Sequence, residues 1–168
     1  MENYVANVIP HLQQWWPVVM VLAYVIGIGL AMVSLAQSIS HKHRFSRSTA
    51  VWTLWAAVLL LNLPALMDSL SMTVFSQTSE QTLSYSPPSS SGAVYIQLAV
   101  YAIATVGIIG IIRGLCLLRD TPQQAMNFSR SIVHLFGGII AINLVTFLRG
   151  IGATLGGDVQ TTIAKILG

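Results

Sequence analysis

A histidine, an asparagine and two adjacent glycines interrupt an apolar run near the end of the chain, at His134, Asn143, Gly137 and Gly138. Polar groups inside a membrane are often functional, so a proton relay or a contact with a lipid headgroup is one interpretation of His134 and Asn143. On one helix, however, Asn143 points almost directly away from His134, whereas a catalytic or metal-binding pair has to converge. An interhelical hydrogen bond is therefore the simpler interpretation of each side chain.

The remaining polar residues do not assemble into a recognisable catalytic or metal site. The segment HKH at 41–43 offers two imidazoles on a basic loop without a third ligand or a carboxylate. Neither a carboxylate pair, a Ser-His-Asp set nor a phosphate-binding glycine loop can be placed. The single cysteine, Cys116, excludes an intramolecular disulfide and a cysteine-based metal site. We expect no enzymatic activity, no metal and no cofactor beyond structural phospholipid.

Small residues recur at helical spacing and predict close helix packing. They fall into three groups: Gly107, Gly110 and Gly114; Gly137, Gly138 and Ala141; and Gly152 and Gly156. Apolar side chains gain nothing by leaving lipid for one another, so small residues mark the places where helix backbones approach. We expect these faces to support a homo-oligomer. The alternative interpretation is that the glycines make the helices flexible.

The composition shows what kind of element must position these residues. Of 168 residues, 54% are hydrophobic and only 8% are charged, against about a quarter in soluble domains, and the mean hydropathy is +0.72. These values predict an all-α integral membrane protein. The net charge of +3 is small, and no basic patch interleaved with aromatic residues indicates a specific nucleic-acid site.

Four apolar segments are long enough to span a bilayer, since a transmembrane helix needs about 20 residues. The predicted spans are 17–40, 49–67, 93–112 and 131–148. They form two helical hairpins, over residues 1–67 and 93–168, the second ending in a glycine-rich tail. Before the first span, Val5, Val8, Leu12 and Trp15 recur at helical spacing and predict a short interfacial helix, although Pro10 would kink it.

Basic residues predict the orientation of these spans. Six of the eight lysines and arginines lie in or beside two of the connections: Lys42, Arg44 and Arg47 between the first two spans, and Arg113, Arg119 and Arg130 around the link between the last two. The positive-inside rule places both connections in the cytoplasm and both termini in the periplasm. We expect the six side chains to contact lipid headgroups or to face a lumen.

The central connection over residues 68–92 is rich in serine and threonine and contains no lysine or arginine. Leu70, Met72 and Val74 alternate with polar residues, and so do Leu83 and Tyr85. Alternation of this kind predicts a small β-hairpin on the non-cytoplasmic side.

An internal repeat is indicated by the letters FSRS, which occur at 45–48 and again at 128–131. Both copies end a basic connection and open the following span. Each half of the chain is then a span, a basic turn and a second span. Two such halves, each with an even number of crossings, would be related by an axis along the membrane normal.

The second half resembles a known family. The segment HLFGGIIAINLVTFLRGIGATLGG, preceded by IIRGLCLLRD, is similar to the TraQ, IcmC, DotE and DotV-like inner-membrane proteins of type IVB secretion and IncI-type conjugation systems. The resemblance covers residues 107–157, and its core is His134, Gly137, Gly138, Ala141 and Asn143. It implies a bacterial envelope protein without enzymatic activity that assembles with other type IV secretion components.

Three functions remain open at this point. The chain is a structural subunit that self-assembles into a membrane conduit or a pilus wall, a fixed inner-membrane scaffold of the same machine, or a small transporter. The plan of each half also resembles conjugative pilins of the VirB type, whose basic turns face a lumen and meet phospholipid headgroups. A transporter would be expected to carry a charge or a broken helix at the membrane midplane, where Asn62, Pro64 and Asn143 are the only candidates.

Overall fold

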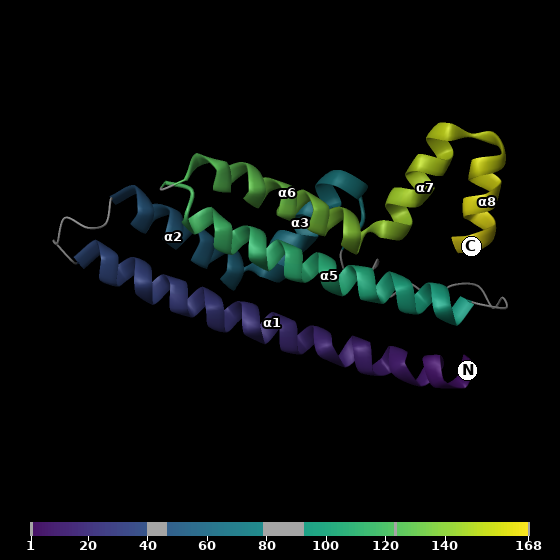
Figure 1. The fold of residues 1–168 in the computed structure, drawn as a ribbon, viewed down its shortest axis with the longest axis horizontal. Coiled ribbons are helices and arrows are strands. Elements are labelled where there is room, and N and C mark those ends of the chain that lie inside the picture. The colour runs from purple at the N-terminus through teal and green to yellow at the C-terminus, as the bar shows by residue number, and fades with distance from the viewer. Residues whose placement is uncertain (1, 40–46, 79–92, 123, 168) are drawn as a thin grey trace.

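The computed structural model describes residues 2–39, 47–78, 93–122 and 124–167, and it places no strand among them. The helices form an elongated bundle in which each long helix is paired with a shorter antiparallel one, and two short C-terminal helices turn away from it at one end (Figure 1). In chain order the helices are α1 Glu2–Ile39, α2 Arg47–Leu61, α3 Leu63–Phe75, α5 Ala93–Arg119, α6 Ala125–Ile142, α7 Leu144–Leu155 and α8 Gly157–Leu167. The all-helical prediction is confirmed for these residues.

Two helical hairpins make up the bundle. Helix α1 packs on α2, α6 packs on α5, and α5 lies against both α1 and α2 (Figure 1). The main core includes Ala23 of α1, Ala57 and Leu60 of α2, Ile108 of α5 and Ile142 of α6, all at most 2% exposed. The basic ends of both hairpins lie at one end of the bundle, and the two chain termini lie toward the other (Figure 1).

The N-terminal segment is not a separate interfacial helix. Helix α1 runs without interruption from Glu2 to Ile39 and contains both Pro10 and Pro17. Each proline removes one backbone hydrogen bond. Long apolar helices tolerate that loss because neighbouring groups satisfy the freed carbonyl. The prediction of a short helix before residue 17 is therefore wrong.

The second and fourth predicted spans are each broken by one asparagine. Helices α2 and α3 meet at Asn62 with a bend of 83°, and α6 and α7 meet at Asn143 with a bend of 85°. Continuous spans over 49–67 and 131–148 are therefore corrected to bent helix pairs. Pro64, in the first turn of α3, lacks the N–H that a continuous helix would use. Asn143 instead turns its side-chain amide back onto the carbonyl of Ile139.

The segment predicted to form the first strand of a β-hairpin is helical, and so is the glycine-rich tail. Leu70, Met72 and Val74 lie in α3, so the first arm of the predicted β-hairpin is wrong, and its second arm lies outside the described residues. The alternation of apolar and polar residues there does not separate two faces, because apolar Met72 and Val74 are exposed and polar Ser71 is buried. The glycine-rich tail is also helical, because α7 and α8 form an antiparallel pair joined at Gly156 and Gly157, both with positive φ.

The helices are compatible with membrane insertion. Among the described residues, the segments Asn7–Ile39 and Ala93–Arg119 are long and apolar enough to cross a bilayer, and the number rises to four if each bent pair counts as one span. Large apolar side chains cover the outside of the bundle, including Val106, Val133 and Leu35 at 60–70% exposure. Water would not tolerate so continuous an apolar surface, whereas lipid would.

Candidate functional site

The most polar point of the interior is the break at Asn143. This side chain is fully buried, and its amide donates to the hydroxyl of Ser71 in α3 at 2.9 Å and to the carbonyl of Ile139 at 3.0 Å. The interhelical hydrogen bond expected of Asn143 is thus present. The amide oxygen, Oδ1, is buried and has no hydrogen-bond partner among the residues that the structure describes. One asparagine therefore holds the second hairpin onto the helix that follows the first break.

The break at Asn62 repeats this local geometry on the surface. Its backbone angles, φ −107° and ψ 26°, nearly match those of Asn143, φ −96° and ψ 30°. Its side-chain amide donates to the carbonyl four residues earlier, Val58, as the amide of Asn143 does to Ile139. Asn62 is exposed, however, and the hydrogen bond of its side-chain amide stays within its own helix. The two breaks therefore differ in burial: Asn143 is buried, whereas Asn62 is exposed.

The glycine faces are used inside the chain, between α5 and α6. A Cβ added at Gly138 would lie 2.6 Å from the carbonyl oxygen of Gly107, and one added at Gly107 would lie 2.7 Å from that of Gly138. A Cβ added at Gly114 would lie 3.1 Å from the Cβ of His134, whereas one added at Gly110 would make only ordinary contacts, the nearest at 3.7 Å. His134 is half-buried there. The backbones of α5 and α6 touch because neither carries a side chain at these points.

The other small residues lie elsewhere. Gly152 packs on Ile163, which joins α7 to α8, and Ala141 lies against Gly107. A Cβ at Gly137 or Gly156 would meet no atom within 4 Å. Gly137 therefore offers an open position on α6 beside the closed one at Gly138.

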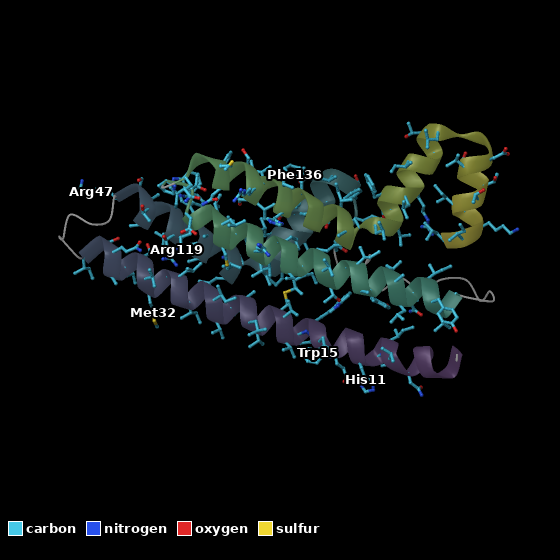
Figure 2. The ribbon with its side chains drawn as sticks, viewed as in Figure 1. His11, Trp15, Met32, Arg47, Arg119 and Phe136 are labelled. Carbon is cyan, nitrogen blue, oxygen red and sulfur yellow. The ribbon has the colours of Figure 1, made fainter. Side chains whose placement is uncertain are left out.

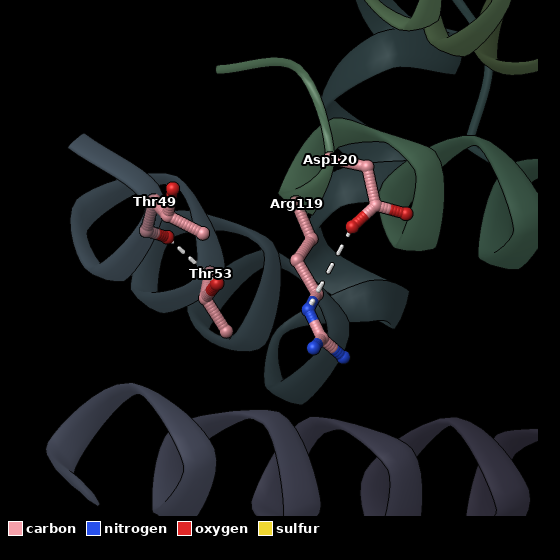
Figure 3. Close-up of polar contacts among 4 residues, drawn as sticks. All are labelled: Thr49, Thr53, Arg119 and Asp120. Carbon is pink, nitrogen blue, oxygen red and sulfur yellow. Dashed lines mark hydrogen bonds and ion pairs between the residues drawn. The ribbon is translucent and has the colours of Figure 1, made fainter. Parts of the chain in front are cut away.

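The basic residues gather at one end of the bundle. Arg47 opens α2, Arg119 ends α5 and Arg130 lies in the first half of α6; Arg47 and Arg130 are exposed (Figure 2). The guanidinium of Arg119 lies 3.9 Å from the carboxylate of Asp120, across from the first turns of α2, where Thr53 donates to the carbonyl of Thr49 (Figure 3). Arg113 is exposed on α5. Lys42 and Arg44 lie outside the described residues.

The two hairpins repeat the same internal contacts. A Cβ added at Gly27 of α1 would lie 3.3 Å from the carbonyl of Ala57, as one at Gly107 would face the carbonyl of Gly138. Ser34 donates to the carbonyl of Ala50 at 2.8 Å, and at the corresponding place Ser131 donates to the carbonyl of Gly114 at 2.6 Å. Equivalent residues are 80 positions apart in α1 and α5 (27 and 107, 34 and 114). They are 81 apart in the second helices (57 and 138, 62 and 143). The letters FSRS are two positions out of this register.

The helices after the breaks pack on each other. Thr146 donates to the side chain of Gln77 at 2.8 Å, and the rings of Phe75 and Phe147 meet edge to face. A groove of about 520 Å³ lies between the C-terminal part of α3 and α7, lined by Val74, Phe75, Phe147, Ile151 and other residues. It is open and mostly apolar, and none of the described residues that line it is titratable.

Comparison with known proteins returns no match: no family model, no curated protein and no solved structure is similar to this chain. Within the described ranges, no three histidine, cysteine or carboxylate side chains lie close enough to hold a metal ion.

Sequence reasoning missed both helix breaks and the pairing of Asn143 with Ser71. A signal was present at the first break, since proline two residues after an asparagine favours a helix start. At the second break only Asn143 itself was visible. The partner, Ser71, lies 72 residues away on a segment that its alternation assigned to a strand.

Proposed function

We propose that this chain is a non-enzymatic structural subunit of a type IVB conjugation or secretion apparatus, embedded in the bacterial inner membrane. The observation that carries the proposal is the pairing of two surfaces: an apolar coat along the helices and arginines gathered at one end. A chain of this shape fits a bilayer with its basic turns in the cytoplasm and its termini in the periplasm. The HxxGGxxAxN segment, which resembles inner-membrane proteins of these machines, supports the assignment to them.

The subunit assembles with itself and with other components of the apparatus, and phospholipid contacts its basic end. Because Gly107, Gly114 and Gly138 are occupied within the chain, self-assembly uses other surfaces than the α5–α6 glycine contact. In a conduit or a pilus wall the chain is a repeated building block; as a scaffold it stays in the inner membrane.

A small transporter is the second candidate, and the paired helix breaks favour it. Interrupted helices at corresponding positions of two repeats are the usual place of a substrate site in transporters. Asn62 and Asn143 occupy such positions, and the free Oδ1 of Asn143 is a buried acceptor. Against it, neither break carries a charged residue at its centre.

Deleting the gene from a donor strain and measuring DNA or effector transfer tests the proposal. We expect transfer to fall by several orders of magnitude and to return with a complementing copy. Recovery of the chain from sheared extracellular filaments identifies a pilus subunit, and its restriction to the inner membrane identifies a scaffold. Unchanged transfer, with a growth defect tied to one solute, would reject the structural role and favour the transporter.

A further inference from the structure

Equivalent surfaces of the two hairpins differ in whether anything covers them. Within the chain, the second hairpin packs on the first through one face of α5. The equivalent face of α1 exists on the first hairpin, 80 positions earlier. The first hairpin likewise receives α5 on α2, and the equivalent receiving surface exists on α6, 81 positions later. These two equivalent surfaces, on α1 and on α6, are more exposed than the surfaces that meet within the chain.

On the docking face of α5 the side chains are buried. Tyr101, whose ring meets Trp16 of α1 edge to face, is 2% exposed, and Ile108 and Leu115 are fully buried. Their equivalents on α1 are large and apolar but uncovered: Val21 is 60% exposed, Ile28 48% and Leu35 60%. The same helix face is thus an interface in one hairpin and an open surface in the other.

The surface that receives α5 also differs between the hairpins: it is buried on α2, and its equivalent on α6 is partly open. On α2, Thr53, Ala56 and Leu60 are fully buried. Their equivalents on α6 are His134, Gly137 and Ala141, of which Gly137 is exposed, whereas His134 and Ala141 are half-buried and partly covered by Gly114 and Gly107 of α5. A side chain at Gly137 would meet nothing within 4 Å. This face of α6 carries polar and small residues that stand out in the sequence.

We propose that α1 of one copy docks across α5 and α6 of the next copy, and so reproduces between chains the packing of α5 across α1 and α2 within the chain. The occupant is a second copy because α5 already packs across α1 and α2 within the chain, and the open surfaces of α1 and α6 are the repeat equivalents of the surfaces that meet there. Such a contact joins different surfaces head to tail, and repeated copies form a ring if the rotation closes and a helical filament if it does not. This inference rests on the proposed function and specifies how its subunits meet.

A groove at the basic end identifies two residues that the proposed interface would bring together. Inside the chain, Leu118 of α5 lines a groove of about 360 Å³ together with Val51, Trp52, Trp55 and Leu59 of α2. The equivalent of Leu118 is Ser38 of α1, and the equivalent of Trp55 is Phe136 of α6. Both are exposed, Phe136 at 59%. Phe136 lies on α6 at the opposite edge of the bundle from α1, so the two positions cannot meet within one chain (Figure 2).

Cysteine cross-linking in native membranes tests the contact. In a full-length chain with Cys116→Ser, the pair Ser38→Cys and Phe136→Cys should form, on oxidation, a ladder of dimers, trimers and larger species. Val33→Cys with Phe136→Cys is the matched control. The α5 equivalent of Val33, Arg113, is exposed and lies outside the intramolecular interface. A ladder for the first pair alone supports the proposal. Equal ladders for both pairs, dimers without larger species, or no cross-link for the first pair would overturn it.

Leucine substitutions at two open glycines give an independent measurement. Gly137→Leu should remove the ladder, because the added side chain fills the receiving surface. Gly29→Leu should leave it unchanged: Gly29 is equally open, and its equivalent, Ile109, stays exposed in the second hairpin. Both variants should keep the thermal stability of the parent chain in detergent. Loss of the ladder in both, or in neither, rejects the surface.

The outcome is separable from the proposed function. If the ladder is absent while gene deletion still abolishes transfer, the interface is wrong and the structural role stands. If deletion leaves transfer unchanged, the structural role fails whatever the ladder shows.

Discussion

At the residue scale, the asparagines at two equivalent positions, Asn62 and Asn143, make different contacts. Asn62 and Asn143 both end a helix by bonding the carbonyl four residues earlier, yet only Asn143 is buried and reaches a second helix through Ser71. The sequence predicted that Asn143 would make an interhelical hydrogen bond, since an amide in an apolar run needs a partner. Its partner could not be predicted, because Ser71 is one of many serines and the bend that brings it near depends on tertiary packing.

A double-mutant cycle measures this contact. Asn143→Ala and Ser71→Ala should each destabilise the bundle, and their coupling energy should be about 0.6–1.7 kcal/mol, the range of hydrogen bonds between membrane helices. Unfolding in mixed micelles provides the free energies. Asn62→Ala, the exposed equivalent, should show no coupling to Ser71→Ala. A cycle that closes to zero for Asn143 would mean that the 2.9 Å contact contributes nothing to stability.

Two glycines on the α5–α6 contact should respond differently to a single methyl group. Gly138→Ala would place a Cβ 2.6 Å from the carbonyl of Gly107 and from Cγ1 of Ile111, so the helices must separate. Overpacking of this kind costs about 1–3 kcal/mol. Gly110→Ala has 3.7 Å to its nearest neighbour and should be neutral. Thermal unfolding in detergent compares the two variants; equal melting temperatures would contradict the close packing.

At the scale of the elements, hydropathy located the apolar helices but not their bends. The predicted span 93–112 lies within α5, and residues 17–39 of the first predicted span lie within α1, because a continuous apolar run needs no tertiary information to form a helix. The breaks depend on one or two residues within equally apolar runs, which a hydropathy window averages away. Helices α2 and α6 are roughly 22 and 27 Å long, less than a hydrocarbon core of about 30 Å, so we expect their bends to lie toward its far boundary when the basic turns are at the cytoplasmic face.

The bends predict where α3 and α7 lie in a bilayer. Because each turns by more than 80° from its preceding helix, both should lie along the non-cytoplasmic surface rather than continue through the lipid. Asp68→Cys and Arg149→Cys, at equivalent positions after the two breaks, should react with a membrane-impermeant maleimide added from that side. The background is Cys116→Ser. Leu54→Cys, exposed on α2 ahead of the break, should stay unreactive in lipid. Failure of both positions to react would place α3 and α7 inside the bilayer.

At the scale of the whole molecule, the arrangement of the hairpins follows from contacts that the sequence displays only faintly. The repeat was first visible in four letters, FSRS, that are out of the structural register by two positions. The true correspondence lies in residue size at the helix contacts: Ala57 matches Gly138, and the carbonyl of each faces a glycine of the preceding helix, Gly27 or Gly107. Small residues at the same points let each pair of helices approach, whichever small residue is used. Residue identities differ between the two halves while residue size at the contacts is kept, so the repeat is clearer in the structure than in the sequence.

The predicted orientation of the whole chain in the membrane can be tested directly. Cysteines near residues 45 and 85 should be labelled from opposite sides of inner-membrane vesicles of known sidedness, the first from the cytoplasmic side. The reason is the asymmetry of the cations, which gather in the connections around 41–47 and 113–130 and are absent from 68–92. Labelling of both positions from the same side would refute the four-crossing arrangement.

The basic end of the assembled molecule provides the last prediction. If copies pack head to tail, the exposed arginines Arg47 and Arg130, with Arg119 beside them, are brought together at one end of a ring or filament, and like charges there repel. Anionic phospholipid relieves that repulsion, because a guanidinium pairs with a phosphate through two hydrogen bonds and each cation near an anionic leaflet contributes about 1 kcal/mol. We therefore expect phospholipid to co-purify at one or more molecules per chain.

Mass spectrometry of lipid extracted from the purified assembly measures the ratio. Replacing Arg44, Arg47, Arg119 and Arg130 by glutamine should lower it several-fold, whereas Arg149→Gln, on α7 away from the basic end, should not. Because the like-charge repulsion is removed with the arginines, assembly of the quadruple variant should depend less on ionic strength than assembly of the parent chain. Lipid retained undiminished in that variant would leave the arginines with the single role of setting the orientation of the chain.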